Sequence, residues 1–212
     1  MSTLAGRVGW LITPVLVAGL GQVMVLKTGM LPALAVPLDG GLHWRGKPLL
    51  GPRKTWRGVI VMTTLSALTA RVLAAATRRS PRLRASCPFD FERINPWLLG
   101  GTLGLGYCLG ELPNSFVKRR VGIAAASTSQ RLAWLQYLVD QSDSVAGCLA
   151  ALRLFYKPSW AEGGFAFATG VALHVGVDYL MHALGVKRRG HSPSQTMPRR
   201  LATAGTGKLS RP

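Results

Sequence analysis

Five blocks of mostly apolar residues constrain the possible fold of this chain more than any other feature. A helix that spans a membrane needs roughly 20 such residues, and core helices of a globular protein would explain one or two runs of this length. The blocks cover approximately residues 9–26, 57–77, 97–113, 135–156 and 164–185. The sequence therefore predicts an all-α fold, a polytopic membrane helix bundle with about five transmembrane helices.

Charged residues are concentrated between these blocks. The 212 residues include 26 lysines and arginines and 8 acidic residues, which gives a formal net charge of +18, yet the mean hydropathy is +0.24. An excess of cations this large indicates a polyanionic partner, such as nucleic acid, phospholipid or a nucleotide. A soluble nucleic-acid binder is usually polar throughout. We therefore predict no nucleic-acid partner and expect the cations to contact the membrane bilayer and phosphate groups.

The distribution of the cations predicts an orientation. We define loop A as residues 38–56, loop B as 78–96, loop C as 114–134 and loop D as 157–163. Five spans place loops A and C and the C-terminal segment on one side, and these segments carry more lysine and arginine than the remainder. Cytoplasmic loops are enriched in these residues. We therefore expect a multi-pass protein of the cell (inner) membrane with the N-terminus outside and large cytoplasmic loops, although loop B has five arginines on the opposite side.

The chain shows no internal repeat and no linker that would divide it. Residues 1–187 are predicted to form one integral membrane domain. Residues 188–212 are rich in Ser, Thr, Pro, Gly and Arg and contain little that could be buried. Such a composition predicts a disordered basic cytoplasmic tail that touches anionic lipid headgroups.

A pair of aspartates is the first candidate site. Asp140 and Asp143 are three residues apart, so they share one face of a helix. Magnesium binds through one or two carboxylates together with waters and substrate phosphates, so this pair is a candidate Mg²⁺ site. The alternative is that one aspartate caps the helix and the other is hydrated.

Two cationic clusters accompany the pair. Lys118, Arg119 and Arg120 are consecutive in loop C, where they would either bind phosphate or anchor the protein at the cytoplasmic surface. Loop A adds further donors for phosphate, namely Lys54, Thr55 and Arg57, among glycines that allow close approach of the backbone.

Three segments together resemble a known family. "PLDGGLHWRGKPLLGPRKTWRG", "GELPNSFVKRRVGI" and "LVDQSDSVAG" are similar to motifs of the CDP-archaeol synthase family, which is related to the phosphatidate cytidylyltransferases. The resemblance extends from about residue 30 to residue 187. One departure is Glu111, which stands where the archaeal pattern has Asp.

The resemblance implies a nucleotidyltransferase that is Mg²⁺-dependent and whose partners are CTP and a lipid phosphate. In this reading Lys118, Arg119, Asp140 and Asp143 form the catalytic set. The metal ligands would be Asp140 and Asp143, with Asp39 and Glu111 as further ligands or nucleotide contacts. Binding of CTP or lipid phosphate would use a larger set, namely Lys54, Thr55, Arg57, Ser115, Lys118, Arg119 and Arg120. The oligomeric state stays open, with a homodimer as one candidate.

The last apolar block contains a polar stripe of its own. His174, Asp178 and His182 recur every four residues and share one helix face. They would either form an intramembrane metal or proton site or pack against the bundle, and the second interpretation is favoured.

Two other functions compete with the enzyme. A non-catalytic protein could bind anionic lipid with the same cations, but such a protein would be free to lose Asp140, Asp143, Lys118 and Lys54. A small transporter could use the buried Asp and His residues, but the carboxylates gather at one rim and no inverted repeat is visible.

Overall fold

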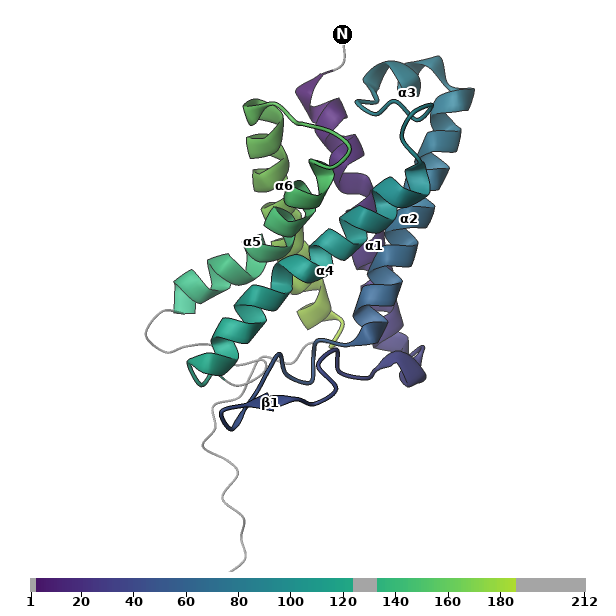
Figure 1. Cartoon of the computed structure of the whole chain (residues 1–212). Helices are drawn as coiled ribbons and strands as arrows, with labels where there is room; N and C mark the ends of the chain where they lie inside the picture. The colour runs from purple at the N-terminus through teal and green to yellow at the C-terminus, as the bar shows by residue number, and fades with distance from the viewer. Residues whose placement is uncertain (1–2, 124–132, 186–212) are drawn as a thin grey trace, which may run out of the picture.

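The computed structural model describes residues 3–123 and 133–185 of the 212-residue chain. The described part is mostly helical, as predicted, with one short hairpin (Figure 1). In chain order the elements are α1 (Leu4–Thr28), η1 (Pro32–Leu34), β1 (His43–Trp44), β2 (Lys47–Pro48), α2 (Trp56–Arg79), α3 (Pro81–Ser86), α4 (Pro96–Arg120), α5 (Ala133–Leu152) and α6 (Trp160–Ala183).

Local side-chain caps explain where several of the long helices begin. Thr3 accepts a hydrogen bond from a first-turn backbone N–H of α1, and Thr55 and Asn95 do the same for α2 and α4. α6 begins with a capping box, in which Ser159 and Glu162 bond to each other's backbone N–H groups. Such caps satisfy N–H groups that have no partner within the helix.

The long helices run alternately up and down, so that loop A and the end of α4 lie together. Lys47 Nζ donates to Arg120 O at 2.8 Å, which ties the β1–β2 hairpin to the end of α4. At the other end, Trp10 Nε1 of α1 donates to Ser86 Oγ of α3 at 3.1 Å. Figure 1 shows the hairpin below the bundle, with α3 and the N-terminus above it.

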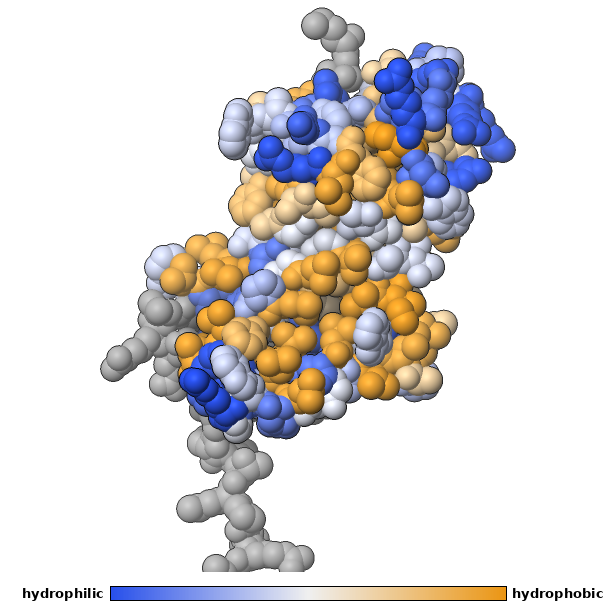
Figure 2. Space-filling view, viewed as in Figure 1, coloured by the Kyte–Doolittle hydropathy of each residue, from blue (hydrophilic) through white to orange (hydrophobic). Residues whose placement is uncertain are grey.

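Three helices in the described part of the chain are long and apolar enough to cross a membrane: α1, α2 and α6. α4 and α5 pack between them and carry Glu111, Asp140 and Asp143. Figure 2 shows hydrophilic residues gathered at the two ends of the molecule, with a largely apolar zone between them. These features show that the chain is a membrane protein. The number of five membrane spans and the position of the candidate site on the cytoplasmic side stay predictions.

Glycines on α4 allow its backbone to approach two neighbouring helices. A methyl group on Gly104 would lie 2.5 Å from Met62 O of α2, and one on Gly106 would lie 2.8 Å from Gly147 O of α5. A methyl group on Gly110 would overlap the backbone oxygen of Asp143. Small residues permit this close helix packing in membranes.

Several boundaries differ from the sequence prediction. The third apolar block was expected to end at residue 113, but α4 continues to Arg120 as a helix. The cations at its end are compatible with the negative end of the helix dipole, and contacts with α5 hold this extension. Loop B includes the short helix α3. The predicted tail, 188–212, and residues 124–132 of loop C lie outside the described residues.

Trp10 of α1 belongs to the apolar core of the bundle. Its side chain is buried in an apolar core with Leu11, Phe89, Leu99 and Leu103. The core lies at the end of the bundle opposite the hairpin and therefore fixes the helices away from the candidate site.

Candidate active site

The centre of the candidate site is a contact between α4 and α5. Asn114 Nδ2 donates to Asp140 Oδ1 at 2.6 Å and to Asp143 Oδ2 at 2.8 Å. One amide group therefore holds both carboxylates on the same side of α5, as their spacing predicts. Each aspartate directs an oxygen at the same nitrogen atom, so the two oxygens converge on a single point.

Lys118 neutralises one of these carboxylates. Its Nζ forms a salt bridge with Asp140, and the two side chains are 17% and 32% exposed. Partial burial makes the attraction stronger than it would be on an open surface. The Lys118 ammonium thus lies beside the aspartate pair, at the point where the sequence predicted phosphate-binding cations and acidic residues to meet.

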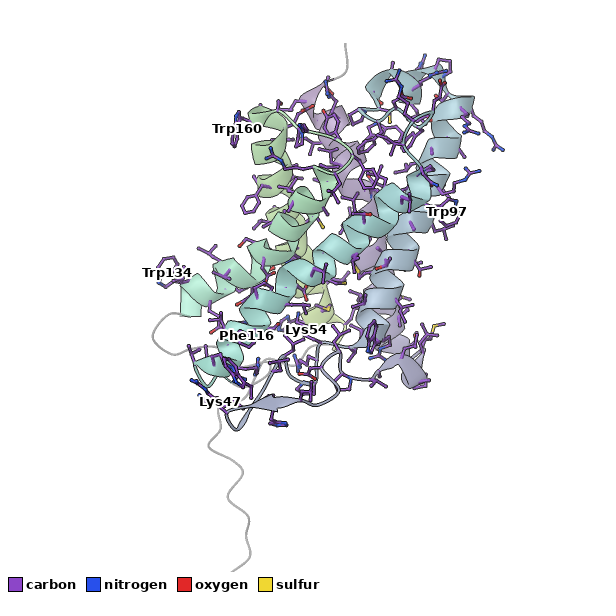
Figure 3. All side chains as sticks on the ribbon, in the orientation of Figure 1. Lys47, Lys54, Trp97, Phe116, Trp134 and Trp160 are labelled. Carbon is purple, nitrogen blue, oxygen red and sulfur yellow. The ribbon has the colours of Figure 1, made fainter. Side chains whose placement is uncertain are left out.

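A second ion pair extends the site towards loop A. Lys54 Nζ bonds to Glu111 Oε2, and Ser144 Oγ donates to Glu111 Oε1 at 3.1 Å. The Ser144 N–H also donates to Asp143 Oδ1 at 2.6 Å. Ser144 is fully buried, and its hydrogen bonds to Glu111 and Asp143 join the Lys54–Glu111 pair to Asp143. We call Asp140, Asp143, Glu111, Lys54 and Lys118 the charged cluster. Lys54 is labelled in Figure 3, near the lower end of the bundle.

Asp39 organises loop A through backbone hydrogen bonds. Its Oδ2 accepts from the N–H groups of Leu50 at 2.8 Å and Gly51 at 3.2 Å, and its Oδ1 accepts from Gly41 at 3.0 Å. Burial favours the neutral acid, but these N–H donors outweigh it and hold the pKa of Asp39 below its ordinary value. The metal or nucleotide role predicted for Asp39 has no support from a contact with the charged cluster in the described residues.

We expect replacement of Asp39 by Asn to destabilise loop A at neutral pH. Hydrogen bonds to a charged group contribute about 1.5–3 kcal/mol each, and the amide retains one acceptor oxygen. Because the pKa is lower in the folded state, the carboxylate stabilises the fold above the unfolded value of 3.8, and this contribution is lost as the pH falls through the folded value. Thermal unfolding in neutral detergent should show a difference between wild type and Asp39→Asn at pH 7 that shrinks below about pH 3.8. Asp90→Asn, an exposed aspartate at the other end, is the control, and a difference that grows on acidification would contradict the assignment.

Arg120 fastens the hairpin instead of lying with the charged cluster. It donates to Trp44 O at 2.5 Å and to Pro48 O, and its guanidinium lies 5.2 Å from the ring centroids of both Trp44 and Phe116. Arg119 donates to Ile123 O at 2.6 Å, with its side chain against Gly51. The structure therefore gives these two arginines structural contacts. Among the recorded contacts of the described residues, Lys118 alone of the three consecutive cations contacts the aspartates.

The other predicted phosphate donors lie around the cluster. Thr55 caps α2, and Arg57 Nη1 donates to Met30 O at 3.3 Å. Ser115 is buried on α4, one residue after Asn114. Within the described residues no recorded hydrogen bond or salt bridge joins Thr55, Arg57 or Ser115 to the carboxylates.

His174 connects α6 to this region. Tyr107 Oη and His174 Nε2 lie 2.7 Å apart, and His174 Nδ1 lies 3.2 Å from Gln141 O, between the two aspartates in sequence. His182 Nδ1 lies 2.8 Å from Asp178 O. In the described residues no three His, Cys, Asp or Glu side chains form a metal-binding group. Packing between helices, the interpretation favoured from the sequence, accounts for His174.

An apolar groove also includes His174 in its lining. Residues of α1, α4, α5 and α6 line it, including Leu16, Leu103, Leu149 and Leu173, and Tyr107 and His174 are its polar members. A groove of this kind can accept a hydrocarbon chain next to the backbone of Gln141.

Comparisons with known proteins agree with this combination of motifs and fold. Residues 4–189 match the family described as CarS-like, CDP-archaeol synthase. The chain belongs to the CDP-archaeol synthase family. The chain is 34% identical over 185 residues to the CDP-archaeol synthase of Halobacterium salinarum, with 79% of this chain and 96% of that protein covered. It is 31% identical over 164 residues to the protein of the same name from Methanosphaerula palustris, with 71% and 87% covered.

A solved structure also matches. It is an intramembrane enzyme for archaeal membrane lipid biosynthesis, with a TM-score of 0.55 and 25% identity, covering 81% of this chain and 92% of that one. CDP-archaeol synthases are CTP-dependent cytidylyltransferases, so the resemblance is confirmed and the chain is a nucleotidyltransferase of this family.

For this CDP-archaeol synthase family member, the donor set fits magnesium. Asp140 and Asp143 offer two hard oxygen ligands that converge, which suits an ion that completes its coordination with water and phosphate. Asn114 donates neutral amide hydrogen bonds to these oxygens, and Lys118 supplies a positive charge beside them. Asp140 and Asp143 are therefore the residues that would hold Mg²⁺.

Two members of the network were missed by sequence reasoning. Asn114 and Ser144 lie beside predicted residues, but amide and hydroxyl side chains are common and no motif singled them out. Helical spacing could have found Asn114, because Glu111, Asn114 and Lys118 are three and four residues apart and share a face of α4.

Proposed function

We propose that this protein transfers the cytidylyl group of CTP to the phosphate of a membrane lipid. The observation that carries the proposal is the charged cluster, in which Lys54 of loop A, Glu111 and Lys118 of α4, and the aspartates of α5 meet at one end of the helices. These segments are distant in the sequence. Membership of the CDP-archaeol synthase family supports the same activity.

The proposed reaction is a substitution at phosphorus. An oxygen of the lipid phosphate attacks the α-phosphorus of CTP, a P–O bond forms, and the bond from the α-phosphorus to the oxygen bridging the β-phosphate breaks. The products are CDP-lipid and pyrophosphate. A phosphomonoester has a second pKa near 6, so the nucleophile is mostly ionised at pH 7 and needs no protein base.

The task left to the protein is positioning and neutralisation of charge, which dominate phosphoryl-type transfer. Lys118 and Lys54 would contact phosphate oxygens of the two substrates. Bound Mg²⁺ would supply further positive charge to the phosphate oxygens. Asn114 and Ser144 would fix the orientation of the carboxylates, because each donates a hydrogen bond to them.

The lipid substrate would enter from the bilayer. The apolar groove would hold part of its hydrocarbon, since apolar residues of four helices line the groove and its lining residue His174 lies 3.2 Å from Gln141 O. Relatives named CDP-archaeol synthase favour an ether lipid of the archaetidic type over phosphatidic acid.

One assay tests the function and the metal together. Purified protein in neutral detergent is incubated with labelled CTP, Mg²⁺ and either unsaturated archaetidic acid or phosphatidic acid. We expect CDP-lipid and pyrophosphate in equal amounts, with no product when EDTA replaces Mg²⁺. Failure of every lipid phosphate to yield product would refute the activity, and full activity in EDTA would refute the metal requirement alone.

A further inference from the structure

A second cationic surface lies at the end of the molecule opposite the charged cluster. A pocket there is lined by Arg71 and Arg78 of α2, by Arg93, and by Asn95 and Trp97 at the start of α4. We call these five residues the arginine pocket. Figure 2 shows the strongly hydrophilic surface at the upper end of the molecule, and Figure 3 shows Trp97 at the edge of α4 beside α2. The proposed transferase reaction uses none of these residues.

The pocket has an excess of positive charge. Arg93 pairs with Asp90 at 3.4 Å, and Glu92, which also lines the pocket, pairs with Arg84 at 3.0 Å. Within residues 3–123 and 133–185, neither Arg71 nor Arg78 forms a salt bridge or a recorded hydrogen bond. The two guanidinium groups that face the pocket from α2 are therefore available to an anion.

The position of Arg71 indicates a ligand that is part lipid. Arg71 precedes the last residue of α2 by eight positions, which places it about 12 Å along the helix from that end. Arg71 and Arg78 are seven residues apart and share a helix face. Nearby outward side chains are apolar and open, with Val72 59% and Leu98 60% exposed. A ligand at this depth would meet guanidinium groups at one end and a hydrocarbon-like surface at the other.

The start of α4 favours the same kind of ligand. The N-terminus of this 25-residue helix carries partial positive charge, which adds to that of the two arginines. Trp97 is exposed at this point, and tryptophan is enriched at the level of lipid headgroups. Guanidinium groups recognise phosphate through paired hydrogen bonds.

We propose that the arginine pocket binds the phosphate of an anionic phospholipid from the leaflet at the N-terminal end of the molecule. Arg71 and Arg78 contact the phosphate, and the acyl chains lie against the outer faces of α2 and α4. The site is separate from the charged cluster, so the lipid bound there is not the substrate. It gives a role to Arg78 and Arg93, two of the five arginines of loop B that the positive-inside pattern leaves unexplained.

The test measures lipid retention by native mass spectrometry in neutral detergent, with phosphatidylglycerol as the probe and phosphatidylcholine as its neutral counterpart. We expect wild type to retain phosphatidylglycerol in preference to phosphatidylcholine. Arg71→Gln with Arg78→Gln should weaken retention at least about tenfold, since each arginine–phosphate contact is charge-assisted. The control is Arg79→Gln with Arg82→Gln, which makes the same change in net charge at the same end, outside the pocket, and should retain the lipid.

Each remaining outcome counts against the proposal. An equal loss of phosphatidylglycerol retention in the Arg79→Gln, Arg82→Gln control would mean that the lipid is held by diffuse attraction to the positive surface and not by the arginine pocket. Displacement of the lipid by millimolar inorganic phosphate would mean a site for a free anion. If the variant with Arg71→Gln and Arg78→Gln does not fold, the variant with Arg71→Lys and Arg78→Lys replaces it in the test. This variant keeps the positive charge but loses the paired hydrogen bonds to phosphate. Undiminished retention of phosphatidylglycerol in it would overturn the proposed site. Circular dichroism and transferase activity in the same detergent check that each variant is folded.

Discussion

Replacement of Asp143 by Asn should reduce CDP-lipid formation by about 10²–10³-fold, the loss typical when one preorganised electrostatic group is removed from a transition state. The carboxylate lies at the centre of the network, where it accepts from Asn114 and from the N–H and hydroxyl groups of Ser144. Asparagine has nearly the same shape, so the protein should still insert and fold. The measurement is the initial rate of product formation from labelled CTP, in equal amounts of purified protein.

Ser142→Ala provides the matched control for Asp143→Asn. Ser142 lies on the same helix, and its hydroxyl donates only to Val139 O at 3.3 Å among the recorded contacts of the described residues. This variant should keep wild-type activity. Wild-type rates in Asp143→Asn, with normal expression and a monodisperse protein, would remove Asp143 from the site and leave the charged cluster without its proposed metal ligand.

Replacement of Gly110 by Leu should cause the second large effect, on stability and activity together. A side chain at Gly110 has no space, because its first carbon would overlap Asp143 O and would lie 3.0 Å from the Cα of Gly147. Overpacking costs about 1–3 kcal/mol. Separation of α4 from α5 would also move Asn114 and Lys118 away from the aspartates, and a 1 Å misplacement costs about 10²-fold in rate. Thermal unfolding in detergent and the CTP assay measure the two effects.

Gly176→Leu is the control for this substitution. Gly176 lies in α6 with no atom within 4 Å of an added side-chain carbon, so the same change should leave both the unfolding temperature and the activity close to wild type. A Gly110→Leu protein as stable and as active as wild type would show that α4 and α5 do not need this close contact.

The helical positions and the acidic pair could be predicted because they depend on local rules. The apolar blocks match the five long helices in the described part of the chain, and the three-residue spacing of Asp140 and Asp143 fixes a shared face of α5. The end of α4 could not be found in the same way. Hydropathy falls after residue 113, but the helix continues because Asn114 and Lys118 have partners on α5.

The three consecutive cations of α4 also show what the sequence could predict and what it could not. Lys118, Arg119 and Arg120 are consecutive, and their charges alone cannot distinguish one that lies with the aspartates from one that holds a hairpin. On a helix, neighbouring residues point about 100° apart, so only one of the three can face α5 at a given depth. The structure selects Lys118 for Asp140 and directs Arg120 to Trp44 and Pro48 of the hairpin.

The sequence by itself determined a helical membrane protein, its family, and an acidic pair on one helix face, because apolar length, spacing and motifs are properties of short segments. Only the tertiary structure decided which residues complete the site. The glycine contacts of α4 set the separation and register of α4 and α5, and that register brings Asn114, Lys118 and Ser144 to the carboxylates. Contacts between distant segments depend on packing that no single segment encodes.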